Sequence, residues 1–303
     1  MLLDVDLPLV TVYIPTHNRV GLVGRAINSV IEQTYSNIEI IVVDDGSTDG
    51  TLEFLNSLSV KHSNLMVLHH SKAKGACAAR NLAIDKASGF FVTGLDDDDE
   101  FLPHRIEEFV ANYDADYSFL FATSIQVSGW EEAKRIEMDS EVSWSDIKNK
   151  NHVGNQIFIE RSRLTADLRF YEKMPAWQDY DLWFRLIKEY GVALRVNNHS
   201  YKLDIASASN RISTSSNAYL GFCMFIERHK TDLSIEQIKN QEVNDLYNRK
   251  VRLSFIETIK AISSVYTAKR LLLLGLLLNC PKCYGLLIVT SDKISRLLRV
   301  IIA

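Results

Sequence analysis

The 303-residue sequence contains few cysteines, and they form no pattern that a structural site would need. The four cysteines, Cys77, Cys223, Cys280 and Cys283, are too few and too scattered for a secreted disulfide framework, so we expect a reducing, cytoplasmic location. Cys280 and Cys283 have the spacing of a zinc or redox pair, but no second pair or nearby histidine completes a ligand set. We therefore interpret them as ordinary residues of the C-terminal tail.

The sequence also lacks a long apolar run, a basic excess and a signal peptide. The apolar run at residues 271–278 is much shorter than the about twenty residues that a membrane-spanning helix needs. A formal net charge of −4 gives no footprint for nucleic-acid binding. The first six residues carry acid where a signal peptide carries base, so the sequence does not indicate export.

Segments with strand and helix patterns alternate through the first hundred residues. Apolar or β-branched runs predict strands at residues 10–14, 38–43, 65–69 and 90–95, and helical spacing predicts helices at residues 22–31, from 51 and at 77–87. Pro15 is expected to end the first strand. The alternation predicts an α/β fold with a mostly parallel, Rossmann-like sheet and flanking helices. Polar, acid-rich segments follow three of these strands, and in a parallel sheet such ends meet at one edge.

The most acidic of these segments is a run of four aspartates at positions 96–99, followed by Glu100. Adjacent carboxylates repel one another and stay together only where water screens them or a cation binds. A solvated loop is the simpler interpretation, but the position beyond a buried strand favours a metal ion with a phosphate. Neither a Gly-x-Gly-x-x-Gly motif nor a Walker loop follows the first strand, so a bound phosphate would need a cation.

The second half of the chain gives weaker patterns. We expect a helix that starts near Pro103, strands at residues 117–123 and 154–159, and a helix after residue 177. In that last helix the apolar side chains should face inward; they are Leu182, Trp183, Leu186 and Ile187. Asp179 lies near its start, where an acid either stabilises the helix terminus or has a catalytic role. The tryptophans at 177 and 183 are interpreted as core residues rather than sugar platforms.

Five segments together resemble glycosyltransferase family 2, in its order and spacing. They are residues 10–19 (VTVYIPTHNR), 42–51 (VVDDGSTDGT), 79–83 (ARNLA), 95–99 (LDDDD) and 178–183 (QDYDLW). The resemblance covers about the first two thirds of the chain and is to the type of enzyme that acts in bacterial surface polysaccharide and O-antigen synthesis. It implies the GT-A fold, a nucleotide-diphosphate sugar donor, Mn²⁺ or Mg²⁺ as cofactor, and inversion at the anomeric carbon.

The resemblance also implies a role for each matching residue. The nucleotide-sugar site would comprise Pro15, Thr16, Asn18, Arg19, Asp45, Arg80, Asp96 and Asp97. Among these, Asp45 would accept a hydrogen bond from the base. The Asp-x-Asp motif falls on Asp96 and Asp98, and Asp98 would bind the metal, with Asp99 supporting the site. Asp179 matches the catalytic base, whereas Gln178 stands where the family commonly has glutamate, so its role stays open.

The implied activity is transfer of one hexose to a hydroxyl of a glycan or of a polyprenyl-diphosphate-linked acceptor in lipopolysaccharide or related synthesis. UDP-glucose or UDP-galactose is the default donor, and the absence of a Gln-x-x-Arg-Trp signature argues against processive synthesis. The alternatives are a non-catalytic carbohydrate- or nucleotide-binding module of the same fold and a nucleotidyltransferase. A nucleotidyltransferase would need a basic, glycine-rich loop, for which residues 15–21 offer only Arg19.

We expect a catalytic domain at residues 1–215 and a helical extension at residues 216–303. Within the catalytic domain, residues 1–102 would bind the nucleotide sugar and residues 103–215 the acceptor. From Lys269 onward the sequence is basic and apolar, and residues 294–302 place isoleucine and leucine on one helical face. This tail either lies peripherally on the inner face of the plasma membrane or packs on protein, and the sequence leaves both open.

Overall fold

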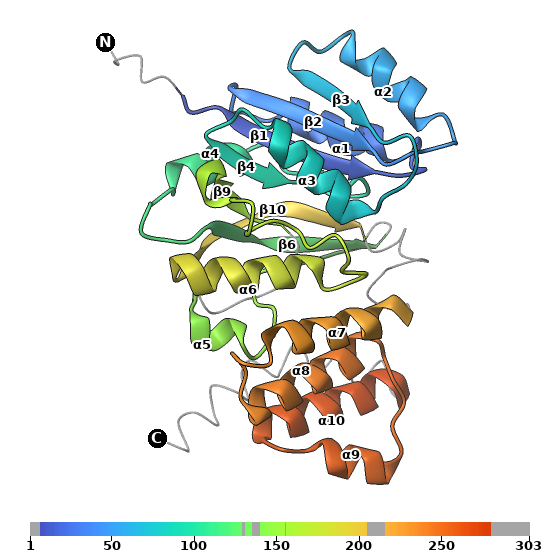
Figure 1. Cartoon of the computed structure of the whole chain (residues 1–303), viewed down its shortest axis with the longest axis vertical. Helices are drawn as coiled ribbons and strands as arrows, with labels where there is room; N and C mark the ends of the chain where they lie inside the picture. Colours follow the sequence, from blue (N-terminus) through green and yellow to red (C-terminus); the bar gives the residue numbers. More distant parts are fainter. Residues whose placement is uncertain (1–6, 129–130, 135–139, 155, 205–215, 280–303) are drawn as a thin grey trace. The chain divides into compact units, whose positions relative to one another are not determined.

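The structure is a computed structural model that describes residues 7–128, 131–134, 140–154, 156–204 and 216–279 (Figure 1). The chain forms two compact units, Met1–Asn210 and Arg211–Ala303. Cys280, Cys283 and the amphipathic pattern at 294–302 lie outside the described residues.

The first unit is a mixed α/β structure around one sheet. Its strands are β1 (Val10–Thr16), β2 (Ile38–Asp44), β3 (Leu65–His69), β4 (Phe91–Gly94), β5 (Glu100–Phe101), β6 (Leu120–Ser128), β7 (Glu131–Lys134), β8 (Glu141–Val142), β9 (Phe158–Glu160) and β10 (Ala193–Asp204). Its helices are α1 (Val23–Ile31), α2 (Thr51–Ser59), α3 (Ala76–Lys86), α4 (Arg105–Ala111), α5 (Trp144–Ile147) and α6 (Gln178–Tyr190), with a 3₁₀ turn at Arg161–Arg163. The strands follow the order β3-β2-β1-β4-β9-β6-β10-β5, with β7 beside β6 and β8 beside β10.

The first four strands form the parallel part of the sheet, as the alternating pattern predicts. β1 pairs in parallel with β2 and with β4, and β2 pairs in parallel with β3. The side chains of β1, β2 and β4 are almost all buried on both faces, whereas β3 is partly exposed, and Val12, Ile14, Ile40 and Val42 are fully buried in the core. Because these strands run in the same direction, the carboxyl ends of β1, β2 and β4 come out along one edge.

The prediction that Pro15 ends the first strand is wrong by two residues. β1 continues to Thr16, and Pro15 pairs with Val43 of β2. On its other side β1 pairs with β4 only from Val10 to Tyr13, so it has a single neighbour at Pro15. A proline is tolerated there because the side of β1 without a neighbouring strand needs no backbone N–H to donate a hydrogen bond.

Beyond β4 the sheet contains antiparallel pairs that the sequence pattern did not predict. β9 runs antiparallel to both β4 and β6, whereas β10 runs parallel to β6. The strand expected at 117–123 spans Leu120–Ser128, and the one expected at 154–159 is shorter and ends one residue later, at Phe158–Glu160. The expected helix near Pro103 begins at Arg105, after a turn in which Arg105 N–H donates to Leu102 O.

The long helix α6 packs its apolar side onto the core as predicted. The four residues expected to face inward, Leu182, Trp183, Leu186 and Ile187, are all buried. Trp183 is a core residue, and its indole N–H donates to the carbonyl of Gly154 at 3.0 Å. Helix α3, which lies in front of the parallel strands in Figure 1, packs against β1 and β2. These two helices supply Asp179 and Arg80 to the candidate site.

The described part of the second unit is helical. Its helices are α7 (Ser216–His229), α8 (Ile235–Asn248), α9 (Phe255–Ala261) and α10 (Val265–Asn279), and α8 packs against α7 and α10. Capping boxes start α8 and α9, formed by Ser234 with Gln237 and by Ser254 with Glu257. Among the described helices, none combines the length and the apolar character that a membrane span requires.

Candidate active site

The carboxyl ends of β1, β2 and β4 are joined by hydrogen bonds through Thr16. The Thr16 hydroxyl donates to Asp97 Oδ2 at 2.7 Å, in the acidic segment after β4. The Thr16 carbonyl accepts a hydrogen bond from the backbone N–H of Asp45, just after β2, at 2.8 Å. The structure thus brings together three polar segments that lie far apart in the sequence.

Arg80 connects the acidic segment to the start of α6. This side chain is buried, and its guanidinium donates to Asp96 Oδ1 at 3.0 Å and to Gln178 Oε1 at 2.9 Å. It also lies 3.9 Å from Asp179 Oδ1 and packs over the ring of Phe170. Gln178, whose role the sequence left open, therefore orients Arg80 as a neutral acceptor. A glutamate there would add a third carboxylate to the surroundings of the guanidinium.

Asp179 lies in the first turn of α6 with its side chain 24% exposed. Its Oδ1 is buried and has no hydrogen-bond partner among the described residues. Burial raises the pKa of Asp179 to about 7, against the positive charge of Arg80, which lowers it; the charge of Asp96 raises it further. Near neutral pH this carboxyl group is therefore able to bind or release a proton.

The neighbouring Asp181 is different. It is fully buried, and Oδ2 accepts two hydrogen bonds from Arg185, at 2.8 and 3.0 Å. Such an i,i+4 pair, whose arginine also donates to the carbonyls of residues 167 and 169, fixes the segment before α6. Of the two acids in the first turn of α6, Asp179 is the one whose side chain is partly exposed and therefore accessible for chemistry.

Asp45 is held beneath the segment that leads into α3. Its Oδ1 lies 2.6 Å from His70 Nδ1 and accepts the backbone N–H of Lys74 at 2.9 Å, while Oδ2 accepts the N–H of Gly75 at 2.7 Å. Burial alone would raise the pKa of Asp45, but these hydrogen bonds outweigh it and hold the pKa below its ordinary value. Asp45 thus stabilises the turn before Arg80, and its contact with a nucleotide base stays a prediction.

The other residues predicted at the nucleotide lie in the loop after β1. Asn18 is exposed with φ of 53°, and its Oδ1 accepts the N–H of Thr48 at 2.8 Å, which ties this loop to the one after β2. Arg19 is partly exposed, with Nη1 3.4 Å from Asp98 Oδ2. Pro15 and Thr16 precede them at the end of β1. Their contacts with a nucleotide also stay predictions.

Two aspartates of the acidic segment have raised pKa values, which shows that their charged forms are unfavourable there. Burial, reinforced by the charges of Asp98 and Asp96, raises the pKa of Asp97 to about 6, although the Thr16 hydroxyl and Arg19 lower it. Burial and the charge of Asp96 likewise raise the pKa of Asp99 to about 8. Crowded carboxylates of this kind are stabilised when a cation binds among them.

The carboxylates of the acidic segment fit a divalent ion that takes only part of its ligands from the protein. Among the described residues, no group of three or more histidine, cysteine, aspartate or glutamate side chains is placed to hold a metal. The side chain of Asp98, the third aspartate of the run, is 29% exposed and therefore accessible. Mg²⁺ in nucleotide sites commonly takes one or two carboxylates and completes its shell with phosphate oxygens and water. Asp98 is suited to such a shared site.

Several residues of the site were not predicted from the sequence. Gln156 donates to Asp96 Oδ1 at 3.0 Å, and the Tyr201 hydroxyl donates to Asp99 Oδ2 at 2.7 Å. Arg25 donates to the carbonyl of Asp98 at 2.8 Å and pairs with Glu100 and Asp204. None belongs to a local motif. The contacts Gln156–Asp96, Arg25–Asp98 and Tyr201–Asp99 each join residues that are 60 to 102 positions apart in the sequence.

Gly94, the last residue of β4, had no sequence signal either. A Cβ there would lie 2.1 Å from Gln156 Oε1 and 2.5 Å from Tyr13 Cζ. Only glycine leaves room for these two side chains directly before the acidic segment.

Comparison with known proteins finds a matching family model and similar proteins. The model of the family described as "Glycosyl transferase family 2" matches residues 11–178, which ends one residue before Asp179. The "Putative colanic acid biosynthesis glycosyl transferase WcaA" of Escherichia coli (strain K12) is 32% identical over 87% of this chain and 96% of its own length. The "UDP-Glc:alpha-D-GlcNAc-diphosphoundecaprenol beta-1,3-glucosyltransferase WfgD" of Escherichia coli is 27% identical over 61% of this chain and 72% of its own length.

A solved structure supports the same grouping at the level of the fold. The mannosyltransferase PcManGT from Pyrobaculum calidifontis, in complex with GDP-Man and Mn²⁺, superposes with a TM-score of 0.61 at 18% sequence identity. The match covers 92% of this chain and 82% of the other. This likeness confirms the GT-A type of α/β fold implied by the sequence resemblance.

Proposed function

The chain belongs to glycosyltransferase family 2, and we propose that it is an inverting, metal-dependent hexosyltransferase with Asp179 as its catalytic base. The observation that carries the proposal is the position of Arg80 between Asp96 and Asp179. It joins the acidic segment, where the donor would bind, to a carboxyl group with a pKa of about 7. A proton acceptor of that pKa is suited to catalysis near neutral pH.

In the proposed reaction the oxygen of an acceptor hydroxyl attacks the anomeric carbon of the donor sugar. The bond from that carbon to the diphosphate oxygen breaks, its electron pair leaves with the nucleoside diphosphate, and the hydroxyl proton passes to Asp179. Attack on the face opposite the leaving group inverts the configuration, and no covalent enzyme intermediate forms. Arg80 favours the ionised form of Asp179 that accepts the proton, because its positive charge lowers the pKa of that group against the effect of burial.

The acidic segment would bind the donor, with Asp98 as metal ligand. When bound there, a Mn²⁺ or Mg²⁺ ion neutralises charge on the departing diphosphate. Asp96 is oriented by Arg80 and Gln156 toward the sugar or ribose, and Asp97 is held by Thr16. Pro15, Asn18, Arg19 and Asp45 complete the nucleoside side of the proposed site. The loops after β1 and β2 that carry these residues are joined to each other by hydrogen bonds.

For the substrates, we propose UDP-glucose or UDP-galactose as donor and a polyprenyl-diphosphate-linked glycan as acceptor. The name of the WfgD relative includes UDP-Glc and a diphosphoundecaprenol acceptor, and that of the WcaA relative includes colanic acid biosynthesis. These names support synthesis of a surface polysaccharide. The experiment is a donor panel of UDP- and GDP-hexoses with Mn²⁺, scored by thermal shift and by release of the nucleoside diphosphate. Failure of every donor to bind or react would contradict the proposal.

A lipid-linked acceptor calls for contact with a membrane surface, and we propose that the second unit makes it. The C-terminal tail that the sequence indicated lies largely outside the described residues, but α9 provides a described apolar face. It buries none of its side chains, and Phe255 is 80% exposed; Ile256 and Ile259 on the same face, and Ile262 directly after the helix, are exposed too. Lys250, Arg252 and Lys260 supply positive charge beside it, which complements anionic lipid headgroups.

A further inference from the structure

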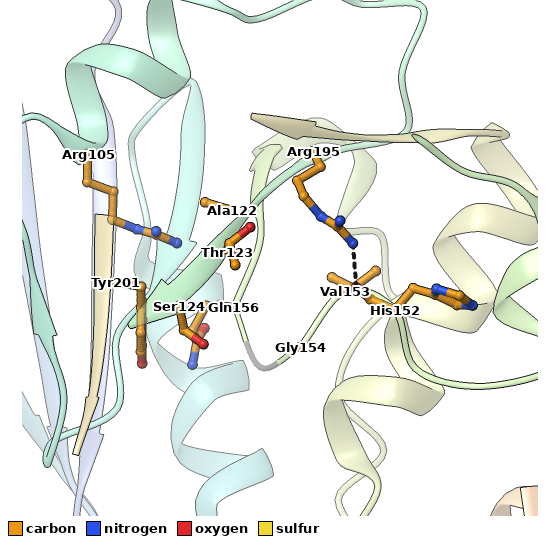
Figure 2. A pocket seen from close by; sticks show the side chains of 10 residues that line it. All are labelled: Arg105, Ala122, Thr123, Ser124, His152, Val153, Gly154, Gln156, Arg195 and Tyr201. Carbon is orange, nitrogen blue, oxygen red and sulfur yellow. Dashed lines mark hydrogen bonds between the residues drawn. The ribbon is translucent and has the colours of Figure 1, made fainter. Parts of the chain in front are cut away.

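A small polar cavity lies beside the acidic segment and is entered by two arginine side chains (Figure 2). Its volume is about 30 Å³, the space of about two ordered water molecules. Arg105 and Arg195 line it together with Thr123, Ser124, Gln156 and Tyr201. Figure 2 shows the two arginines on either side of Thr123 and Ser124, whose side chains carry hydroxyl groups. Cationic and hydroxyl groups thus surround a space large enough for one small polar group.

Arg105 carries a positive charge into the protein interior. It is the first residue of α4 and only 1% exposed, and Nη1 donates to Ser200 Oγ at 3.1 Å. Among the described residues no carboxylate forms an ion pair with it, and its Nε has no hydrogen-bond partner. Burial lowers the pKa of Arg105 to about 10, so the guanidinium is still charged at neutral pH. A buried cation without a counter-ion is costly and gains from an incoming anion.

The packing around Arg105 fixes its guanidinium without neutralising it. The group lies 4.6 Å from the centroid of the Phe109 ring, 4.7 Å from that of Phe101 and 5.0 Å from that of Tyr201. These cation–π contacts hold the side chain in place and leave its charge available. On the opposite side of the cavity, Arg195 donates from Nη2 to the carbonyl of His152 at 3.3 Å.

Two residues of the cavity wall also belong to the candidate active site. Gln156 donates to Asp96 Oδ1 at 3.0 Å, and Tyr201 donates to Asp99 Oδ2 at 2.7 Å. Gln156 and Tyr201 therefore line the cavity and also contact the acidic segment. A sugar held at Asp96 would have this cavity within the reach of one of its substituents.

We propose that the cavity is a subsite for the carboxylate of an acidic sugar, a uronic acid carried by the donor or by the acceptor. This inference rests on the proposed glycosyl transfer and specifies the charge of one substrate; a uronic acid on the donor would replace the neutral hexose proposed above. A carboxylate matches the cavity in size, and its two oxygens match the paired N–H groups of a guanidinium. The Thr123 and Ser124 hydroxyls are able to donate to the same oxygens. A neutral hexose leaves Arg105 without a counter-ion.

The test compares acidic and neutral ligands that are otherwise alike, on the full chain with Mn²⁺. One arm titrates UDP-glucuronate and UDP-galacturonate against UDP-glucose and UDP-galactose. The other titrates methyl glucuronide and methyl galacturonide, with UDP present, against the corresponding neutral glycosides. In one of the two arms the acidic ligand should bind at least about tenfold more tightly than its neutral counterpart, as expected for charge-assisted hydrogen bonds. A preference among the nucleotide sugars assigns the carboxylate to the donor, and a preference among the methyl glycosides assigns it to the acceptor.

The variants separate the charge of Arg105 from its packing. Arg105→Gln should abolish the preference for the acidic ligand, and Arg105→Lys should keep part of it. If Arg105→Gln does not fold, Ser124→Asp places a carboxylate in the cavity and should abolish the preference, with Ser124→Asn as the matched uncharged control.

Two results would overturn the subsite: acidic and neutral ligands that bind within twofold of each other in both arms, or a preference unchanged by Ser124→Asp. If neutral nucleotide sugars still bind in that case, the hexosyltransferase proposal stands. If no nucleotide sugar binds at all, that proposal fails as well.

Discussion

Arg80 Nη1 lies 3.9 Å from Asp179 Oδ1, at the start of a helix that begins 98 residues after Arg80. The same guanidinium donates to Asp96 Oδ1 at 3.0 Å. One buried cation thus lies between the segment proposed to bind the donor and the group proposed to remove the acceptor proton. Burial raises the pKa of Asp179 to about 7, against the charge of Arg80, which lowers it, and the charge of Asp96 raises it further.

Replacing the proposed base tests its role without changing its shape. Asp179→Asn should lower turnover by about two to four orders of magnitude, the usual effect of losing a general base, while donor affinity changes little. Steady-state rates together with nucleotide-sugar titration measure the two effects. Asp181→Asn is the structural comparison and should reduce stability, because it breaks the pair with Arg185. Turnover close to that of the unmodified protein in Asp179→Asn would remove the assignment.

The pH dependence of the reaction should report the ionisation of Asp179. A base works in its deprotonated form, so kcat/KM should rise with pH to a plateau, with a midpoint near the pKa of about 7. Arg80→Gln should move this midpoint to higher pH, because the charge that lowers the pKa is gone, and Arg80→Lys should move it less. A pH–rate profile measured on each variant checks the direction. A midpoint that is the same in all three proteins would exclude Arg80 as the group that sets this pKa.

The stability of the metal-free protein should fall as pH rises through the neutral range. The pKa values of Asp97, Asp99 and Asp179 are all raised in the folded state, so the folded state binds more protons than the unfolded state above pH 4. Denaturant unfolding between about pH 4 and 8 measures the slope. Asp99→Asn should flatten it, since this residue has the highest of the three pKa values and no longer ionises. A slope of opposite sign would contradict the assigned shifts.

Removing room beside Asp96 should weaken the donor site. In Gly94→Ala the new Cβ would meet Gln156 Oε1 and the ring of Tyr13, and overpacking of this kind typically costs about 1–3 kcal/mol. Because Gln156 orients Asp96, the KM for the donor should rise as well. Gly21→Ala is the control, since a Cβ at that position would have no neighbouring atom within 4 Å. Equal donor affinity and stability in both variants would show that the Gly94 contact is unimportant.

Membrane contact through α9 is testable by flotation of the full chain with vesicles. The protein should float with vesicles that contain anionic phospholipid and remain in solution with neutral phosphatidylcholine vesicles. The double variant Phe255→Ser with Ile259→Ser removes apolar surface that is exposed in the structure, so folding should be unaffected and flotation reduced. Failure of the unmodified protein to float with either vesicle would end this proposal.

The sequence predicted the fold best where local patterns and tertiary contacts agree. The strand at residues 65–69 was predicted to the residue, and the helix expected near Thr51 begins there, because an apolar run and a helix after a Gly-containing turn have clear signatures. β6 was placed wrongly, since its second half, from Ser124 to Ser128, is largely polar and is held by pairing with β7 and β10. Long-range pairing of this kind leaves no periodic trace in the sequence.

The candidate site was predictable in its acids but not in the groups that hold them. Asp96, Asp98 and Asp179 were identified because they belong to motifs of contiguous residues. The partners of Asp45 and Asp96, His70 and Gln156, lie 25 and 60 residues away and in no motif, so only the structure reveals them. Those partners decide which carboxylates are buried acceptors and which are accessible for chemistry.

The most direct test of the proposed function is a crystal structure with Mn²⁺ and a nucleotide-diphosphate sugar. We expect anomalous scattering from manganese at Asp98, with the diphosphate bound to the same ion. The sugar should be oriented so that the face of its anomeric carbon opposite the diphosphate is open toward Asp179. Side chains of residues 96–98 that point away from the nucleotide, with no manganese beside them, would contradict it.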